Sequence, residues 1–486
     1  MPGKDGYMLT IKNTGLILGP GLAALMLLVG APEGLPFPAW ATGALMVWMA
    51  IWWATEPIPI PVTSLLPLVV LPLVGAASPK VVGSGYAHHI VLLLLGGFIV
   101  AIGIERWGLH KRIALSVVVR VGISPRALIF GFMAATALLS MWISNTATTL
   151  MMVPIALSAA AALKDESGHF VTAVLLGVCY AASIGGVATP IGTPTNLIAM
   201  DWLQRETGSS IGFPQWMAFG IPAVLLLIPA AWWSVSRGLK QGGDGAAVMA
   251  SVRRDKQSLG AMTVPERRIA MVFLLVALLW VTRLWTVQLA AELGWETLSR
   301  YSGAQIDMMI AILGAVLAFI VPAGAGQSRA LLTWEEAVKL PWGVLLLFGG
   351  GIALGNAVKD TGLSVWIGDN LGVLNVLPAI FFIAVVVAVV IFLTELTSNV
   401  ATMTTLAPIL GALAVGIGAA PASLLAPAAV AASCAFMLPV ATAPNAIIYA
   451  TDEVTVAQMM KHGFVVNLIA IAVITMIGFW LAPLVL

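Results

Sequence analysis

"WISNTATTLMMVPIAL", residues 142–157, places polar side chains in the middle of a stretch that otherwise suits a lipid bilayer. Those side chains belong to Ser144, Asn145, Thr146, Thr148 and Thr149. No charged residue or histidine occurs between Arg126 and Lys164, yet this run is too long for one span of about 20 residues. Its first limb, residues 128–143, would be about 24 Å long as a helix, short of the roughly 30 Å hydrocarbon core. We therefore predict a re-entrant hairpin over residues 128–163, whose tip lines a protein cavity or water.

The composition is that of a polytopic membrane protein. Of the 486 residues, 60% are hydrophobic and 9% are charged, whereas soluble domains carry about 25% charged residues. A second apolar segment, residues 377–418, is also too long for one span. Candidate spans lie near residues 16–31, 39–55, 60–76, 89–108, 171–200, 215–235, 269–288, 305–322, 341–362, 424–451 and 464–485. The sequence therefore predicts an all-α integral membrane protein with eleven transmembrane helices and two re-entrant hairpins.

The distribution of lysine and arginine indicates an N-terminus in the cytoplasm and a C-terminus outside. In that orientation 18 of the 23 cationic residues lie inside, in agreement with the positive-inside rule. The charged segment 236–268 then becomes a cytoplasmic linker between two halves. We expect a multi-pass protein of the cell's inner, plasma membrane, in contact with lipid. The net charge of +2 gives no indication of a nucleic-acid partner, and Cys179 and Cys434 are interpreted as small hydrophobic residues.

The polar motif occurs twice. Residues 392–410 read FLTELTSNVATMTTLAPIL, so Ser-Asn-x-Ala-Thr recurs 254 residues after its first occurrence. Two flanking motifs recur in the same order: LLLLGGF and LLLFGGG precede the two occurrences, and TPIGTPTN and LPVATAPN follow them, at residues 92–98, 345–351, 189–196 and 438–445. A lone Ser-Asn-Thr would be interpreted as helix packing or backbone bonding. Three elements at nearly one offset indicate an internal repeat instead.

The predicted topology makes the two repeats inverted, with hairpin 128–163 on the cytoplasmic side and hairpin 377–418 on the outer side. We expect the first repeat over residues 88–235, the second over 341–486, and scaffold helices over 1–87 and 269–340. Inverted repeats with broken segments at corresponding positions indicate a binding site near the membrane midplane of a secondary transporter. TPIGTPTN and LPVATAPN break two of the expected spans, leaving helix N-termini for an anion and free carbonyls for a cation. Serine, threonine and asparagine oxygens suit a hard cation such as sodium.

These paired motifs resemble those of the divalent anion/sodium symporters, and the resemblance covers nearly the whole chain. TEPIPIPVTSLLPL, AQIDMMIAILGAVLAFIVP and MMKHGFVVNLIAIAVI, at residues 55–68, 304–322 and 459–474, are also similar to family segments. The resemblance implies a first sodium site at Ser140, Ser144, Asn145 and the carbonyl of Gly192, and a second at Thr394, Thr397, Asn399 and the carbonyl of Ala441. It implies a substrate site at Ser144, Asn145, Thr146, Ser398, Asn399, Val400 and Thr442. A homodimer with an elevator motion is implied too.

The function predicted first is import of C4-dicarboxylates such as succinate, malate or fumarate, coupled to co-transported sodium ions and needing no organic cofactor. Sodium-independent dicarboxylate exchange and sodium/sulfate symport are the alternatives. Two residues depart from the family pattern: Val400 offers no hydroxyl, and Ala443 stands where a proline is usual. Animal carboxylate carriers of the family resemble the Ser-Asn-Val form, so Val400 does not argue against a carboxylate substrate.

Two other interpretations concern Ser144 or Ser398 as a nucleophile and Glu395 as a functional acid. A membrane hydrolase using Ser144 or Ser398 would need a nearby base, but residues 127–163 and 396–451 contain no His, Lys, Asp or Glu. The sequence therefore predicts that the protein is not an enzyme. Glu395 is the only charged residue between Asp369 and Asp452, and such an acid is a functional candidate. A structural anchor for the second hairpin is favoured, since Met141 stands at the equivalent position of the first repeat.

Overall fold

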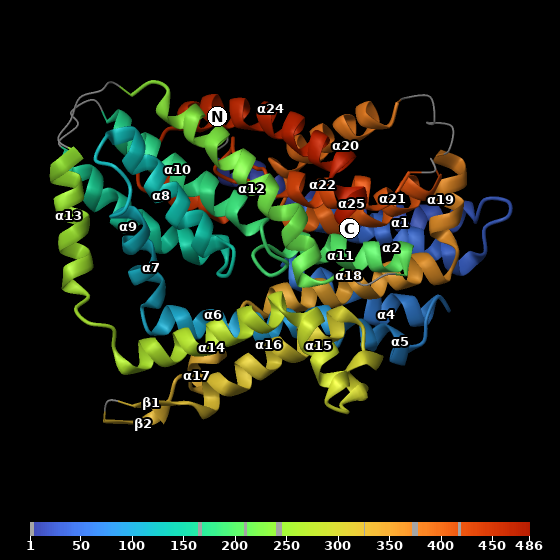
Figure 1. Ribbon diagram of the computed structural model, residues 1–486. Coiled ribbons are helices and arrows are strands. Elements are labelled where there is room, and N and C mark those ends of the chain that lie inside the picture. The colour runs from blue at the N-terminus through green and yellow to red at the C-terminus, as the bar shows by residue number, and fades with distance from the viewer. Residues whose placement is uncertain are drawn as a thin grey trace.

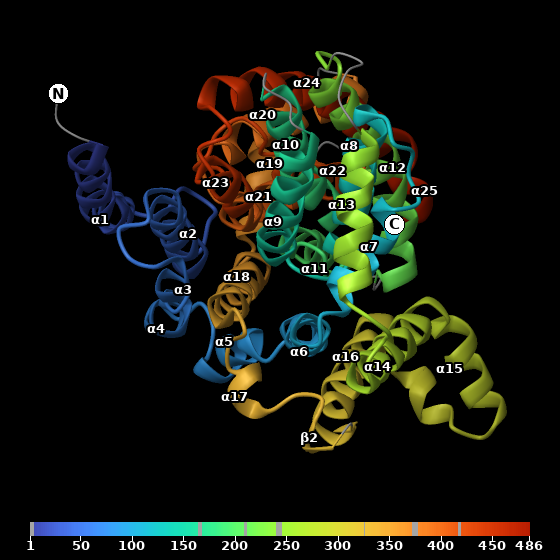
Figure 2. The same cartoon turned by 90° about the vertical axis from the view of Figure 1, so that its left-hand side faces the viewer.

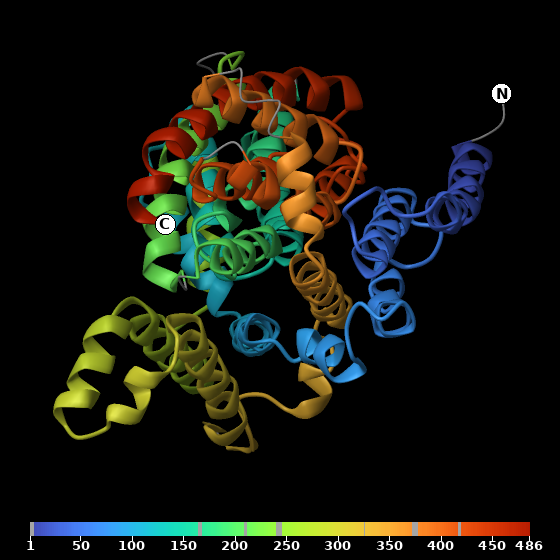
Figure 3. The same cartoon turned by 90° about the vertical axis from the view of Figure 1, so that its right-hand side faces the viewer.

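The structure, a computed structural model, describes residues 4–163, 168–208, 211–239, 245–324, 326–371, 378–416 and 419–486. The described chain is helical except for a pair of short antiparallel strands, β1 (Pro322–Gly324) and β2 (Gln327–Ala330), which the all-α expectation did not include. The helices form two groups. One is a bundle in the upper part of Figure 1, and the other is a supporting group that lies below it and, in Figures 2 and 3, also to one side.

The bundle contains both hairpins and both broken segments. Its helices are α8 (Pro125–Ser140), α9 (Asn145–Leu163), α10 (His169–Gly186), α11 (Pro194–Thr207), α12 (Phe213–Ser236), α20 (Ala379–Thr394), α21 (Asn399–Gly416), α22 (Ala422–Ala432), α23 (Ala443–Tyr449), α24 (Val456–Trp480) and α25 (Ala482–Val485). The most enclosed of the long helices is α10, and 89% of its residues are buried. The packed centre of the protein therefore lies inside the bundle.

The supporting group holds the remaining long helices. Its members are α1 (Lys4–Val29), α2 (Phe37–Thr55), α3 (Ile60–Thr63), α4 (Leu66–Leu73), α5 (Pro79–Tyr86), α6 (His89–Arg106), α14 (Val264–Val281), α15 (Arg283–Glu292), the 3₁₀ turn η1 (Glu296–Arg300), α16 (Gly303–Ile320), α17 (Trp334–Ala337) and α18 (Trp342–Asp360). The connecting helices are α7 (Leu109–Val118), α13 (Gly245–Ser258) and α19 (Leu363–Leu371). Helices α6 and α18, which the sequence placed at the start of each repeat, pack against α16 and α5 in the supporting group.

The number of membrane spans differs from the eleven expected. By length and composition, nine helices in the described ranges can cross a membrane, or ten if α14 and α15, bent by 79°, count as one span. The expected span at 60–76 falls short because its helical part, Ile60–Leu73, is shorter than a span and is interrupted between α3 and α4. The expected span at 424–451 is divided by its break into α22 and α23. Conversely, α9, with its 19 residues, is long and apolar enough to cross a membrane although it is one limb of a hairpin.

Both predicted hairpins form, and their first limbs have the same length. Helices α8 and α20 each have 16 residues, about 24 Å, before the chain turns back into α9 and α21. Ser124 caps α8 by accepting the N–H of Ala127 at 3.2 Å, and Pro125 occupies the first turn, where its missing N–H costs nothing. In α20 a proline, Pro378, stands at the N-cap position itself, without a side-chain cap. Residues 377, 417 and 418 of the second predicted hairpin lie outside the described residues.

The linker over residues 236–268 contains a helix, α13, that packs along α9 and α7. Its buried face is formed by Val248, Met249 and Val252. The charged residues 253–256, which follow these positions, made the segment look like a linker in the sequence. The structure instead places a helix against the second limb of the first hairpin (Figure 1).

A buried ion pair fixes α12 of the bundle against the supporting group. Arg283, at the start of α15, donates from Nη1 to Oδ2 of Asp307 on α16 at 2.8 Å. The same carboxylate oxygen accepts the backbone N–H of Phe213, at the start of α12, at 3.1 Å. The side chains of this pair are only 4% and 3% exposed, so removing either partner would leave a buried unpaired charge.

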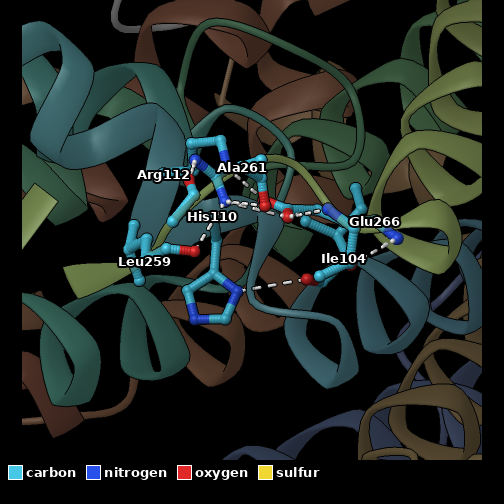
Figure 4. A network of polar contacts seen from close by, with 8 residues as sticks. Ile104, His110, Arg112, Leu259, Ala261 and Glu266 are labelled. Atoms are coloured by element: carbon cyan, nitrogen blue, oxygen red, sulfur yellow. Dashed lines mark hydrogen bonds and ion pairs between the residues drawn. The ribbon is translucent and has the colours of Figure 1, made fainter. Parts of the chain in front are cut away.

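A second joint lies where α7 leads from the supporting group into the first hairpin. Arg112 on α7 donates from Nη2 to Oε2 of Glu266 at 3.1 Å and from Nη1 to the carbonyl of Gly260 at 2.9 Å (Figure 4). In the same region Nδ1 of His110 lies 3.1 Å from the carbonyl oxygen of Ile104 (Figure 4). These contacts tie α7 to the start of α14 and to the end of α6.

Candidate functional site

A cavity of about 1280 Å³ lies where the two hairpin tips and the two helix breaks meet. The tips line it with Ser144, Asn145, Thr146, Thr397, Ser398, Asn399 and Val400. The breaks line it with Gly192, Thr193, Pro194, Ala441, Thr442, Ala443 and Pro444. The structure therefore brings together in one cavity all the residues predicted for ion and substrate binding, except Ser140 and Thr394.

Ser140 and Thr394 lie behind the tips, where both side chains are fully buried. Oγ of Ser140 is 2.8 Å from Oδ1 of Asn145 and 2.6 Å from the carbonyl oxygen of Ala182. In the second hairpin, Oγ1 of Thr394 is 2.8 Å from Oδ1 of Asn399 and 2.9 Å from the carbonyl oxygen of Ala432.

Each of these hydroxyls forms a cluster of three oxygen atoms. A hydroxyl carries one proton, which can serve only one of its two acceptor neighbours at a time. Each cluster is therefore rich in lone pairs and poor in donors, which favours a cation with a preference for oxygen. The clusters sit at the same place in the two repeats, 254 residues apart.

Each break is held by an asparagine that the sequence analysis did not select. Asn196 and Asn445 are fully buried and donate from Nδ2 to carbonyls of their own loop. The acceptors are Gly186, Val187 and Thr189 for Asn196, and Ala435 and Leu438 for Asn445, at distances between 2.7 and 3.3 Å. The signal for them was present, because each is the last residue of its motif, TPIGTPTN or LPVATAPN.

The two repeats interlock at the cavity. Helix α11, after the first break, packs against α21 and α22 of the second repeat, and α23, after the second break, packs against α9 and α10 of the first. Oγ1 of Thr195 lies 2.9 Å from Oγ of Ser433. Sγ of Cys179 donates to Oδ1 of Asn445 at 2.8 Å. Each hairpin is therefore closed by the half-helix of the other repeat, so the four segments act as one unit.

Three helices of 14 or more residues begin at residues that line the cavity: α9 at Asn145, α11 at Pro194 and α21 at Asn399. The first N–H groups of a helix have no partner within it and carry partial positive charge, so these ends favour an anion. Ser144 caps α9, because its Oγ accepts the N–H of Ala147 at 3.3 Å. The cavity thus offers positive helix ends beside two oxygen clusters.

The remaining wall comes from the supporting group and the connecting helices. Its apolar part includes Phe98, Ala101 and Ile102 of α6 and Val344 of α18. Its charged residues are Glu56, Glu105, Lys111, Asp255 and Lys339. None of the cavity residues from the bundle is a lysine or an arginine.

His110 of α7 also lines the cavity, and burial lowers its pKa from the ordinary value. A histidine whose pKa lies below its usual 6.5 is neutral at physiological pH. His110 and the cavity residues of the bundle therefore present only neutral groups and helix ends to a ligand, and fixed positive charge near the cavity comes from Lys111 and Lys339.

Comparison with known proteins agrees with a site for an anion and cations. A family model described as "Sodium:sulfate symporter transmembrane region" matches residues 12–486. The chain is 40% identical over 487 residues to the sodium-dependent dicarboxylate transporter SdcS of Staphylococcus aureus strains MRSA252 and NCTC 8325, with 97% of this chain and 91% of the relative covered.

Two solved structures share the fold. The YdaH transporter of Alcanivorax borkumensis matches with a TM-score of 0.56 and 16% identity, over 92% of this chain and 98% of that one. MtrF of Neisseria gonorrhoeae, described as representing a class of antimetabolite efflux pumps, matches with a TM-score of 0.60 and 16% identity, over 91% and 95%. At this identity the matches concern the fold alone.

The family match over nearly the whole sequence confirms the resemblance inferred from the motifs, and this chain belongs to the sodium:sulfate symporter family.

Proposed function

We propose that this protein is a secondary transporter that moves small dicarboxylates together with sodium ions. The observation that carries the proposal is the single cavity in which two oxygen clusters and three helix N-termini meet. The 40% identical relative is itself named a sodium-dependent dicarboxylate transporter. Membership of a transporter family also confirms the prediction that the chain is not an enzyme.

Each proposed sodium site includes two oxygens of one cluster, the hydroxyl of Ser140 or Thr394 and Oδ1 of Asn145 or Asn399. The first consists of Ser140, Ser144, Asn145 and the carbonyl of Gly192, and the second of Thr394, Thr397, Asn399 and the carbonyl of Ala441. The hydrogen bond between the hydroxyl and the asparagine oxygen of each cluster already holds two ligand oxygens 2.8 Å apart. A sodium ion that binds both oxygens replaces this hydrogen bond with little rearrangement. Sodium is here a transported substrate of the protein.

The proposed dicarboxylate lies between the two tips, with one carboxylate toward each repeat. The residues assigned to it are Ser144, Asn145, Thr146, Ser398, Asn399, Val400 and Thr442. Val400 offers only its backbone and an apolar surface, so the second Ser-Asn-x motif supplies one side-chain hydroxyl to the substrate where the first supplies two. Helix N-termini contribute about 0.3–1 kcal/mol each, which is less than two charges cost in a membrane. The co-bound sodium ions supply the missing positive charge.

The transport cycle that we propose is an elevator motion. The bundle carries substrate and sodium, while the supporting group, with homodimeric contacts and lipid around it, stays fixed. The connecting helices α7, α13 and α19 link the two bodies, as such a motion needs (Figure 2). In the proposed orientation the N-terminus is cytoplasmic, the C-terminus is outside, and the protein lies in the inner membrane.

A substrate panel tests the proposed chemistry. We expect unlabelled malate and fumarate to compete with labelled succinate for uptake into proteoliposomes, and sulfate at the same concentration to leave uptake nearly unchanged. The reason is that polar groups from both repeats line one cavity, so two separated carboxylates can engage both sets at once. Competition by sulfate as strong as that by malate would assign the protein to sulfate instead.

Single-cysteine labelling tests the proposed inverted topology. We replace the two buried cysteines by Cys179→Ser, which keeps a donor for Asn445, and Cys434→Ala. A cysteine at Ile123, 58% exposed before the first hairpin, should react with an impermeant maleimide only from the cytoplasm. A cysteine at Ala420, exposed after the second hairpin, should react only from outside. Labelling of both positions from one side contradicts the inverted arrangement.

A further inference from the structure

We infer that Glu395 is a positioning residue that gives the second sodium site a higher sodium affinity than the first. This inference rests on the proposed function, because it takes the two oxygen clusters to be sodium sites. Glu395 directly follows Thr394, is 3% exposed and does not line the cavity. It therefore touches neither the proposed ion nor the substrate, and acts through the groups that it holds.

Every hydrogen-bond partner of the Glu395 carboxyl group is an N–H donor. Oε1 accepts the backbone N–H groups of Phe436 at 2.8 Å and Met437 at 3.0 Å, and Nδ2 of Asn467 at 2.8 Å. Oε2 accepts the N–H groups of Met437 at 3.0 Å and Leu438 at 3.1 Å. A protonated carboxyl would have to donate to an acceptor, and none is among these partners. This is the geometry of an ionised carboxylate with charge-assisted hydrogen bonds.

Leu438 connects this carboxylate to the proposed ligands of the second site. Its N–H binds Glu395, and its carbonyl accepts the N–H of Ala441 at 3.2 Å and Nδ2 of Asn445 at 2.8 Å. Ala441 lines the cavity, and its own carbonyl is a proposed sodium ligand. Glu395 thus fixes the loop that presents this carbonyl, and it also places a negative charge one residue from the ligand Thr394.

The first repeat has a neutral link at the same place. Met141 stands 254 residues before Glu395, and its side chain can carry no charge. Thr189 donates from Oγ1 to the Met141 carbonyl at 2.5 Å and accepts the N–H of Gly192 at 3.2 Å. The loop that presents the Gly192 carbonyl is therefore held by this hydroxyl and by Asn196, without a fixed charge at the equivalent position.

The helices before the two breaks end differently, which explains why a carboxylate is needed only once. Helix α10 ends at Gly186, and the offset of 249 between the breaks would place the end of α22 at residue 435. Helix α22 instead ends at Ala432. The earlier end frees backbone N–H groups in the buried loop that follows, where each needs a partner. Glu395 accepts hydrogen bonds from three of these N–H groups, so the loop remains non-helical beside the second oxygen cluster.

The sodium affinity of each site is measured in a variant that keeps only that site. The variant Asn145→Ala removes the first site and Asn399→Ala the second. For each purified variant, the rise in Tm is measured against sodium concentration without substrate, with choline keeping ionic strength constant. We expect half-maximal stabilisation at lower sodium for Asn145→Ala than for Asn399→Ala. Adding Glu395→Gln to Asn145→Ala should raise that sodium concentration roughly tenfold or more, because charged hydrogen bonds are lost.

The controls separate positioning from a general loss of stability. Adding Glu395→Gln to Asn399→Ala should leave the sodium midpoint unchanged within about twofold, whatever its effect on the starting Tm. The matched substitution at the pseudo-symmetric position, Met141→Gln, should likewise leave the midpoint of the second site unchanged. If Glu395→Gln does not fold, Asn467→Leu takes its place, since it removes one donor and keeps the carboxylate.

The outcomes distinguish this inference from the proposed function. If the wild-type protein shows no sodium-dependent stabilisation, the proposed sodium sites are wrong. If the wild type responds but Glu395→Gln, or Asn467→Leu in its place, leaves the midpoint of the Asn145→Ala protein unchanged, the role of Glu395 is wrong and the transport proposal stands. An equal shift in the Asn145→Ala and Asn399→Ala proteins also overturns the inference, because it indicates a general structural effect.

Discussion

Replacing Asn145 or Asn399 by alanine is expected to abolish transport, lowering sodium-driven succinate uptake by roughly 10- to 100-fold or more. Each asparagine occupies a hairpin tip, begins a helix whose N-terminus faces the cavity, and supplies Oδ1 to an oxygen cluster. The substitution therefore removes one group that serves both the ion and the substrate. The measurement is uptake of labelled succinate into proteoliposomes at saturating sodium.

Folding should survive both substitutions, because neither asparagine is fully buried. Ser140 and Thr394 each keep a second acceptor, the carbonyl of Ala182 or of Ala432. Tm and the elution volume in detergent should therefore stay close to those of the wild type. The matched control is Asn13→Ala, on the exposed surface of α1, which should transport normally. Wild-type uptake by either tip variant would show that its half of the proposed site is wrong.

Gly192→Ala is expected to reduce uptake by roughly tenfold or more and to raise the sodium concentration needed for half-maximal uptake. A Cβ atom on Gly192 would lie 2.4 Å from the carbonyl oxygen of Gly186 and 2.9 Å from its Cα. Both obstacles are backbone atoms, so the loop itself must move. Gly186 in turn packs against Asn145, since a Cβ there would lie 2.6 Å from Oδ1. The movement therefore displaces the Gly192 carbonyl from the first proposed sodium site.

The control for this variant is Gly83→Ala. Gly83 lies on helix α5, and a Cβ there meets no atom within 4 Å, so uptake should be unchanged. The second repeat carries Ala435 and Ala441 at the corresponding positions, 249 residues on. Its break follows the shorter helix α22 and has room for these methyl groups. Normal uptake and sodium dependence in Gly192→Ala would remove the Gly192 carbonyl from the site.

The sequence predicted the hairpins because limb length and internal polarity are local properties. A run without charge from residue 127 to 163 can only be divided into two short limbs, and α8 and α9 form there. The nine or ten candidate spans of the described residues differ from the eleven expected for a related reason. Hydropathy alone does not register that the helical part of 60–76 is short, or that the limb α9 is as long as a span.

Tertiary partners decided what the sequence could not. The sequence analysis assigned no partner to Arg283, which is buried against Asp307. An acid inside the apolar run 305–322 was the signal for such a pair, and it was not used. The buried roles of Asn196 and Asn445 depend on loops that only the folded break creates. Helix α13 was missed because its partner, α9, is far away in the sequence.

Coupling to sodium is the central claim, and the most direct test is succinate uptake into proteoliposomes that contain only this protein. Uptake is measured with sodium or choline outside, and with or without dicarboxylate inside. The account predicts uptake that vanishes in choline and rises with sodium more steeply than in direct proportion, because two sodium sites flank one substrate site. Undiminished uptake in choline, driven only by internal dicarboxylate, would contradict it and identify a sodium-independent exchanger.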